Sequence, residues 1–498
     1  MNVNPITRLD YPDPDVIRVE DTYYMVSTTM HFMPGCEILQ SFDLVHWEHV
    51  TYVSETLDHP DAQQLKSGQN IYGQGMWAAS LRYHEGRFCI CFVANDTRKT
   101  YLYTSEKIDG PWKKQLIEGF YHDGSLLFDE DGRNYIVYGN DEIWITELNE
   151  DLTAPKKDGL HRLLVSDHKN PELGYEGSHI QKINGYYYIF LIHSLRDRWM
   201  RTEACFYSDS LEGEFTGGDV LCDDRGYCGQ GVAQGGIVDT PDGKWYAMLF
   251  QDSGAVGRIP ILLPVTWKDH FPFFGQNGHV PEEIEVHSTR PGYIYQPLVG
   301  SDDFCNGLLP RWQFNHDPDP RYYHLDALQG TYTITTREVC TELTQAVNTL
   351  TQRMSYPSCA AEVTVDASAL KEGDVAGLCA LQSCYAAVGI TKHHGKYEVL
   401  MLDKKEDGIL DMTERTVVES HQMDFRLEAD FCNMKDEARC YYRVNKGDWL
   451  PIGTVHKLYF KLDHFTGCRF GLFCYAAEET GGSACFRDFK YYDVDEIS

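Results

Sequence analysis

One pattern occurs five times in the first 250 residues of this chain. Each copy starts with small or polar residues, runs through a short apolar stretch, turns at Gly, Asn or Asp, and continues into an aromatic-led apolar run. Turn residues between two such runs are typical of a β-hairpin. The copies start 45 to 65 residues apart, at residues 13–27, 78–92, 123–139, 176–190 and 234–250. A β-unit that recurs at about 40–50 residues, lengthened by insertions, predicts the blades of a β-propeller.

Five copies predict five blades around a central channel, and the first residue of each copy should lie at the same end of that channel. These residues are Asp13, Ala78, Asp123, Glu176 and Gln234. Three carboxylates would therefore converge on one axis, although facing charges repel each other and each loses hydration. Because a folded chain gains little stability from such a cluster, we expect the acids to serve a function.

The composition argues against several classes of partner. The formal net charge is −31, from 75 acidic and 44 basic residues. Nucleic acids and anionic membranes require a basic patch, so we expect neither, whereas a neutral sugar is compatible with this charge. No apolar run approaches the ~18 residues of a membrane span, and no basic and apolar leader opens the sequence, which predicts a cytoplasmic protein. The 16 cysteines lack paired CxxC spacing, which favours free buried thiols over disulfides or a zinc site.

A second domain is expected after the repeats. Residues 288–301 are rich in turn residues and are typical of a linker. Beyond them, short segments alternate apolar and polar residues, as in DFRLEADF at 424–431, and several are joined by Gly-Lys or Lys-Gly turns. This pattern predicts a two-sheet β-sandwich of jelly-roll type. We therefore expect an all-β chain, with a five-bladed β-propeller over residues 1–298 and a jelly-roll-like β-sandwich over residues 299–498.

The three acids suit one kind of chemistry. Two carboxylates on either side of a glycosidic bond, one acting as base and one as acid, are the minimal apparatus for its hydrolysis. A third negative charge raises the pKa of its neighbour and keeps that neighbour protonated. Glu176 is the natural proton donor, because it has the longer side chain and glycines on both sides. Asp13 stands between two prolines that stiffen the backbone and aim its carboxylate.

Three segments, NPITRLDYPDPDVIRVEDTYYM, HDGSLLFDEDG and YEGSHIQKINGYYY, resemble the signature segments of glycoside hydrolase family 43. The likeness covers residues 4–270, in order and at family-like spacing. That family comprises inverting enzymes on a five-bladed propeller, including β-xylosidases, α-L-arabinofuranosidases and arabinanases. The resemblance implies that Asp13 is the general base, Asp123 the carboxylate that modulates and orients the acid, and Glu176 the general acid. The C-terminal half resembles the sandwich domain of the β-xylosidase-type members.

Five further residues are candidates for contact with a sugar. The rings of Trp77 and Phe32 can stack on a sugar face, with simple packing as the alternative for Phe32. His179 follows the third acid by two residues and can orient a carboxylate, or be a satisfied core histidine. Arg258, in GRIPILLPVTW, resembles the family's arginine that contacts the substrate and the modulating carboxylate. Gln234 stands where many members carry a histidine that helps hold a central calcium; it offers no imidazole nitrogen, so we expect no required cofactor and leave a structural calcium open.

The favoured interpretation is an inverting exo-acting hydrolase that releases xylose or arabinose from hemicellulose-derived oligosaccharides. An endo-arabinanase is an alternative, but it needs an open cleft. A non-catalytic carbohydrate-binding propeller is another, but it has no need of three converging carboxylates. An exo-acting enzyme needs a pocket that ends behind the terminal sugar, so we expect the sandwich to send a loop over the cleft. The oligomeric state and the preferred pentoside stay open, because pocket shape distinguishes the two sugars and no motif does.

Overall fold

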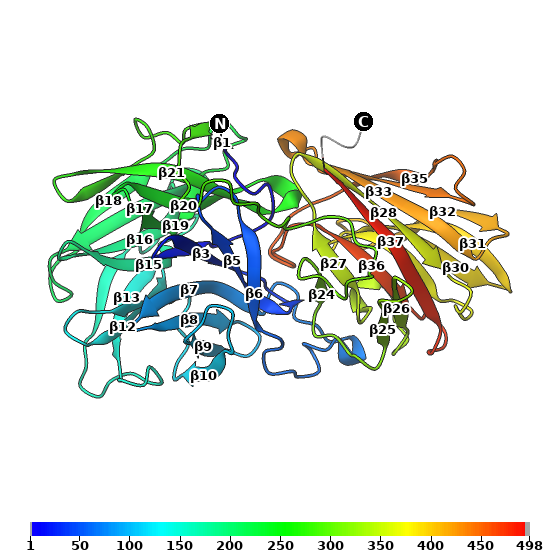
Figure 1. Ribbon diagram of the computed structural model, residues 1–498, viewed down its shortest axis with the longest axis horizontal. Coiled ribbons are helices and arrows are strands. Elements are labelled where there is room, and N and C mark those ends of the chain that lie inside the picture. Colours follow the sequence, from blue (N-terminus) through cyan, green and yellow to red (C-terminus); the bar gives the residue numbers. More distant parts are fainter. Residues whose placement is uncertain (1, 494–498) are drawn as a thin grey trace.

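The computed structural model describes residues 2–493 as two β-domains that lie side by side (Figure 1). The first domain is a five-bladed propeller of four-stranded antiparallel sheets, as predicted, and each predicted hairpin supplies the two innermost strands of one blade. From the channel outward the blades are β2 (Asp15–Val19), β3 (Thr22–Ser27), β5 (Gly35–Ser41) and β6 (Glu48–Ser54); β7 (Met76–His84), β8 (Arg87–Ala94), β9 (Lys99–Ser105) and β10 (Lys113–Ile117); β11 (Ser125–Phe128), β12 (Asn134–Asn140), β13 (Glu142–Leu148) and β14 (His161–Ser166); β15 (Glu176–Ile183), β16 (Tyr186–Ser194), β17 (Arg201–Ser208) and β18 (Thr216–Leu221); and β19 (Val232–Asp239), β20 (Trp245–Asp252), β21 (Arg258–Lys268) and β22 (Phe271–Phe274).

Local turn chemistry explains why these segments form hairpins. Asn184 and Gly185 join β15 to β16 with positive φ angles of 50° and 84°. A two-residue turn with positive φ at both residues matches the right-handed twist of the strands on either side, and Asn-Gly adopts it readily. The strands that follow alternate or run apolar because both faces of a blade are covered by its neighbours.

Apolar packing closes the propeller into a ring. Each pair of adjacent blades shares a buried apolar cluster, and one of these clusters joins blade five to blade one. The chain start reinforces this closure: the buried Asn4 side chain accepts from the Leu262 amide at 3.0 Å and donates to the Leu262 carbonyl at 2.8 Å. A short pairing of β1 (Asn2–Val3) with β23 (Glu283–Ile284) adds to it. The innermost strands are thereby held around one axis.

The second domain is a sandwich of two antiparallel sheets, which confirms the predicted second fold. The larger sheet has eight strands, in the order β32-β31-β30-β29-β36-β27-β24-β4, and the smaller has seven, in the order β25-β26-β37-β28-β33-β34-β35. Their bounds are β4 (Phe32–Met33), β24 (Gln313–Asn315), β25 (Tyr323–Asp326), β26 (Thr331–Thr335), β27 (Leu350–Arg353), β28 (Ser358–Asp366), β29 (Val375–Leu381), β30 (Ala386–His393), β31 (Lys396–Lys404), β32 (Leu410–Val418), β33 (Gln422–Asp430), β34 (Glu437–Arg443), β35 (Leu450–Lys457), β36 (Arg469–Tyr475) and β37 (Ser483–Asp493). Short 3₁₀ turns occur at η1 (Lys66–Gly68), η2 (Gly254–Val256), η3 (Leu343–Gln345) and η4 (Cys432–Met434).

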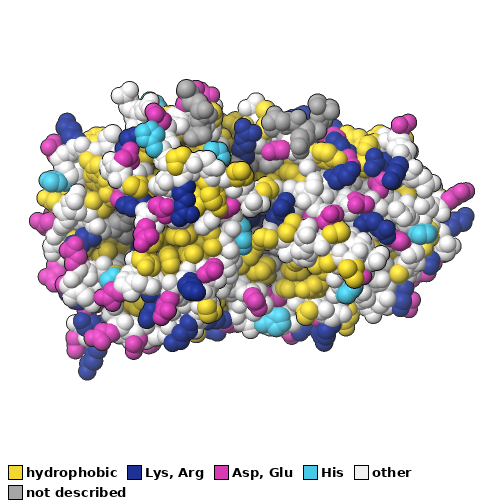
Figure 2. All heavy atoms as spheres, in the orientation of Figure 1, with side chains coloured by type: hydrophobic (Ala, Val, Ile, Leu, Met, Phe, Trp, Pro, Cys, Tyr) yellow, Lys and Arg dark blue, Asp and Glu magenta, His cyan; other side chains and the backbone are white. Residues whose placement is uncertain are grey.

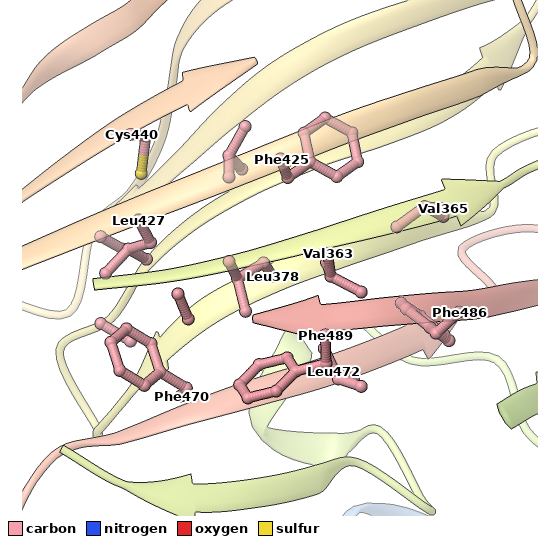
Figure 3. Close-up of a cluster of buried hydrophobic side chains, with 14 of the residues drawn as sticks. Val363, Val365, Leu378, Phe425, Leu427, Cys440, Phe470, Leu472, Phe486 and Phe489 are labelled. Carbon is pink, nitrogen blue, oxygen red and sulfur yellow. The ribbon is translucent and has the colours of Figure 1, made fainter. Parts of the chain in front are cut away.

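The core of the sandwich follows from strand alternation. In β33, every second residue is buried, including Phe425 and Leu427, while the residues between them are more exposed. These side chains meet Leu378, Phe470 and Leu472 of the facing sheet (Figure 3). Interdigitation of this kind between two sheets is the main stabilising contact of a β-sandwich.

The two domains share one sheet and a buried ion pair. Strand β4 lies in the sequence between two strands of blade one, yet it pairs with β24 of the sandwich. Next to it, the Arg353 guanidinium of the sandwich lies 2.8 Å from the Glu37 carboxylate of blade one and stacks 4.0 Å from the Tyr11 ring. All three side chains are buried. Breaking this pair would leave an uncompensated charge in the interface, so the domains are held in one arrangement.

The surface and the thiols agree with the sequence predictions. Acidic and basic side chains are interspersed over the face shown in Figure 2, over both domains. The 16 cysteines, all within residues 2–493, are free, and most are buried. Among the described residues, no helix has the length and apolar character needed to cross a membrane.

Candidate active site

The start of every innermost strand has the same unusual backbone conformation. Asp13, Ala78, Asp123, Gly177 and Gln234 occupy corresponding positions, with positive φ angles of 51°, 28°, 49°, 65° and 65°. In blades two, four and five a β-bulge accompanies this residue. Positive φ is uncommon outside glycine and is concentrated at functional sites. The repeated kink turns these residues toward the channel, where they surround one narrow cavity.

The equivalence of Glu176 to Asp13 and Asp123 is off by one residue. The position that corresponds to them in blade four is Gly177, where a Cβ atom would lie 2.6 Å from Cδ of Gln234. Glu176 corresponds instead to Trp77 and His122, the residues directly before the kink in blades two and three. Its carboxylate therefore lies off the channel axis, beside the other two acids rather than opposite them.

The three acids nonetheless share one pocket of about 800 Å³. Both domains form its walls. The propeller side includes Asp13, Trp77, His122, Asp123, Glu176, Trp199, Arg201, Gln234, Asp252 and Arg258. The sandwich side includes Met434, Asp436, Lys457 and part of the segment between β35 and β36, residues 458–468, which we call the pocket loop: Leu458, Tyr459, Phe460, Lys461, Leu462 and Phe465. The prediction that the sandwich covers the cleft is thus confirmed.

Asp13 is held by two donors. Its Oδ1 accepts a hydrogen bond from Nη1 of Arg258 at 3.1 Å, and its Oδ2 accepts one from the Thr28 hydroxyl at 2.5 Å. The side chain is 7% exposed. The sequence comparison implied that Arg258 contacts the modulating carboxylate Asp123, but here its partner is Asp13. The arginine thus orients the predicted base.

Asp123 is buried beneath the pocket floor. Its Oδ2 accepts a hydrogen bond from the Gly177 amide at 3.0 Å. Burial raises the pKa of Asp123 to about 6, the nearby Glu176 and Asp13 carboxylates add to the rise, and the charge of His122 opposes it. A carboxylate in this state titrates close to neutral pH, as expected of a group that tunes its neighbours.

Glu176 faces the pocket. Its side chain is 19% exposed, and Oε2 accepts a hydrogen bond from Nδ2 of Asn140 at 2.6 Å. Nε2 of His122 lies 3.6 Å from the same oxygen. Asn140 gave no local sequence signal, because it is simply the last residue of β12. His122 directly precedes Asp123 in the sequence, which was its only signal, and sequence analysis gave it little weight.

The remaining predicted contacts divide into two groups. Trp77 lines the pocket, with its ring 5.4 Å from that of Phe465, and Gln234 also lines it. Phe32 was wrongly predicted as a sugar contact: it is 1% exposed in β4, and the Arg469 guanidinium stacks on it at 3.5 Å.

His179 was also wrongly predicted as a sugar contact. It lies deeper in the channel, where its Nδ1 is 3.1 Å from Oδ1 of Asp15. Asp15 is itself paired with Arg82 at 2.8 Å, in the structural role expected for it.

Metal ligation fits these residues poorly. Among the described residues, His122, Asp123 and Glu176 form one group with ligating atoms within 4.8 Å of one another. Asp123 raises the pKa of His122 to about 9 despite its burial, so the imidazole holds a proton where a metal needs a lone pair. The channel beneath the acids has a cavity of about 10 Å³. That is room for about one water and not for the 6–8 oxygen ligands of calcium.

Comparisons with known proteins agree with this geometry. The family model described as Glycosyl hydrolases family 43 matches residues 3–272, and the model described as Beta xylosidase C-terminal Concanavalin A-like domain matches residues 301–492. A solved structure described as a bifunctional GH43-CE protein of Bacteroides eggerthii is 42% identical, with a TM-score of 0.93 over 100% of this chain. The chain spans 64% of the length of that protein.

Two curated proteins are similar over most of their lengths. A beta-xylosidase of Formosa agariphila is 27% identical, over 99% of this chain and 89% of its own. A non-reducing end alpha-L-arabinofuranosidase of Bacteroides ovatus is 24% identical, over 82% of this chain and 79% of its own.

Proposed function

Because the chain belongs to glycosyl hydrolases family 43, a family of inverting glycoside hydrolases, we propose that it is an exo-acting enzyme that releases xylose or arabinose from hemicellulose-derived oligosaccharides. The observation that carries this proposal is the position of the three acids in a pocket walled by both domains. A wall behind the acids accommodates the end of a sugar chain better than its middle. The names of the similar proteins cover both pentosides.

The geometry supports a single displacement. Asp13, oriented by Arg258 and Thr28, removes a proton from a water molecule as the water oxygen attacks the anomeric carbon. Glu176 gives its proton to the glycosidic oxygen as the bond from that oxygen to the anomeric carbon breaks. The sugar leaves with inverted configuration, and a second proton exchange with solvent resets both carboxyl groups. Asp123 holds the Gly177 amide and supplies the negative charge beside the acid.

The pocket loop supports exo action over the endo alternative. Phe465 lies 5.4 Å from Trp77, ring to ring, and 4.2 Å from the Arg258 guanidinium. An aromatic ring above the acids offers a face for one sugar and blocks the path of a continuing chain.

We propose a reducing compartment, the cytoplasm, as its place of action, and no required metal. The support for the first is the set of free cysteines, because disulfides form in oxidising compartments. The support for the second is the protonated state of His122 within the group of acids.

The decisive experiment compares hydrolysis of 4-nitrophenyl β-xyloside with that of the α-L-arabinofuranoside, followed by proton NMR of the first product. We expect release from at least one glycoside, with inverted anomeric configuration and unchanged rate after chelation by EDTA. Asp13→Ala should abolish activity on both activated and unactivated substrates. Glu176→Ala should retain more activity on the activated one, because nitrophenolate leaves without a proton. A retained anomer, or equal losses in both variants on both substrates, would contradict the assignment.

A further inference from the structure

A histidine lies between two of the acids without bonding to either. Nε2 of His122 is 3.6 Å from Oδ2 of Asp123 and 3.6 Å from Oε2 of Glu176. The atom is buried and makes no hydrogen bond within the described residues. The histidine is thus placed to act on both carboxylates through its charge rather than through one directed bond.

A single turn of blade three positions the histidine and the acid together. The Gly139 amide donates to the His122 carbonyl at 3.0 Å, and the next residue, Asn140, donates its side-chain amide to Glu176. Gly139 has a φ of 140°, and a Cβ atom there would lie 2.0 Å from the Glu142 carbonyl oxygen. The backbone therefore fixes the distance between the imidazole and Glu176 and leaves no room for drift.

The imidazole carries a positive charge at neutral pH. The Asp123 carboxylate raises the pKa of His122 to about 9, against the effect of burial, and Glu176 and Asp13 contribute in the same direction. The other charged side chains around the pocket are Glu172, Arg201, Asp252, Arg258, Asp436, Lys457 and Lys461. Of these, Arg258 is bonded to Asp13, and Arg201 is paired with Asp252 at 2.7 Å.

Charge changes on Glu176 during the reaction. As its proton moves to the glycosidic oxygen, a second carboxylate forms beside the Asp123 carboxylate. Two facing anions in a partly buried site repel strongly, and a cation close to both relieves that repulsion. Because the negative charge on Glu176 is larger in the transition state than in the ground state, a fixed cation beside it lowers the barrier.

We propose that His122 is a positioning residue whose imidazolium stabilises the carboxylate that forms on Glu176 as the leaving group takes its proton, and keeps Asp123 ionised. This inference rests on the proposed hydrolase function. It applies to the protonation step alone, so substrates that leave without a proton should depend on it little.

The first test needs no activity. We would follow the His122 ring protons of the full-length protein by NMR between pH 5 and 10, assigning them with His122→Gln. The imidazole should titrate near pH 9 in the unaltered protein and markedly lower in Asp123→Asn. Titration near pH 6.5, the ordinary value for histidine, would overturn the proposal whether or not the protein cleaves any glycoside.

The second test uses kinetics. His122→Gln should lower kcat/KM on an unactivated xylo- or arabino-oligosaccharide by about 10- to 100-fold, and that on the nitrophenyl glycoside by a much smaller factor. Removing the cation raises the pKa values of the neighbouring acids, so both limbs of the pH–rate profile should move to higher pH. His122→Lys, which restores the charge, should recover part of the loss and return the limbs toward their original positions.

His287→Gln is the matched control, because His287 is exposed and outside the pocket; it should change neither rate nor profile. Equal losses of His122→Gln on both substrates with an unmoved profile would indicate a merely structural role. An unaltered protein that cleaves neither glycoside would contradict the proposed function, while the NMR titration would still judge His122.

Discussion

At the scale of residues, the two outer acids are held differently, in keeping with different tasks. Both oxygens of Asp13 are fixed, by Arg258 and Thr28, and its side chain is almost fully buried. Glu176 accepts one hydrogen bond, from Asn140, and part of it faces the pocket. A base must aim at one water, whereas an acid must reach a leaving group and regain a proton from solvent.

Asn140→Ala tests the hydrogen bond to the acid. A hydrogen bond to a charged group contributes about 1.5–3 kcal/mol, and this one strengthens as Glu176 loses its proton. We expect kcat on unactivated oligosaccharides to fall by roughly 10- to 100-fold, with a smaller loss on the nitrophenyl glycoside. Asn134→Ala, at the other end of β12, is the control and should change kcat less than about twofold. A loss equal on both substrates would argue against a role in proton donation.

At the scale of elements, the pocket loop is fastened to the propeller at several points. The Gly467 amide donates to Oδ2 of Asp10 at 2.8 Å, and the Cys468 amide donates to the Ala255 carbonyl at 2.8 Å. Nη2 of Arg258 donates to the Phe465 carbonyl at 3.2 Å. The arginine that orients Asp13 thus also holds the loop that forms the opposite wall.

Gly467→Ala should displace this loop without unfolding the chain. A Cβ atom at Gly467 would lie 2.1 Å from the Val256 carbonyl oxygen and 2.9 Å from Cβ of Asp10, both in the propeller. We expect kcat/KM on oligosaccharides to fall by roughly tenfold or more, because a shift of about 1 Å in a positioned site is costly. Gly218→Ala, where a Cβ atom meets nothing within 4 Å, is the matched control. Unchanged kinetics in a folded Gly467→Ala protein would show that the loop does not shape the pocket.

At the scale of the whole molecule, a buried ion pair and a group of histidines join the two domains. The ion pair is Arg353 with Glu37. The histidines are His31 of the propeller, His316 of the sandwich and His464 of the pocket loop; the His31 ring lies 4.8 Å from that of His316 and 5.7 Å from that of His464. All three are buried, and His464 stacks on Tyr72 at 3.9 Å.

Arg353→Met should destabilise the protein by about 3–5 kcal/mol, because it leaves Glu37 charged and buried. The double variant Arg353→Met with Glu37→Gln should recover most of this loss, since no uncompensated charge remains. Denaturant unfolding measures both. Equal stability of the single and double variants would show that the cost comes from lost packing of the arginine rather than from the charge.

The histidine group predicts lower stability in acid. Burial lowers the pKa of His31, His316 and His464, so the unfolded chain binds protons below about pH 6.5 that the folded chain does not. Their contribution to stability is therefore present above pH 6.5 and is lost as the pH falls toward the lowered pKa values. Each such histidine should remove about 2 kcal/mol between pH 6.5 and 5.

Thermal unfolding from pH 8 to 5 measures this effect. We expect the pH dependence to be shallower in His464→Gln than in the unaltered protein. His393→Gln, an exposed site in the sandwich, should leave the slope unchanged. An identical slope in His464→Gln would mean that other groups carry the acid sensitivity.

The propeller, the sandwich and the identity of the three acids could be predicted from the sequence, because their signals are local. Hairpin turns, strand alternation and the segments around Asp13, Asp123 and Glu176 each lie within about twenty neighbouring residues. The β-bulge before His179, by contrast, shifted Glu176 by one position relative to the other acids, and no residue pattern announced that shift.

The contacts that make the pocket were decided by tertiary structure alone. Arg258 reaches Asp13 across 245 residues of sequence, and the Gly467 amide reaches Asp10 across 457. Phe32 illustrates the limit: its aromatic ring suited a sugar, but β4 was drawn into the sheet of the second domain and buried there. Which ring faces the substrate depends on how two separately predictable domains pack, and that packing is determined by many weak contacts between distant residues rather than by any local pattern.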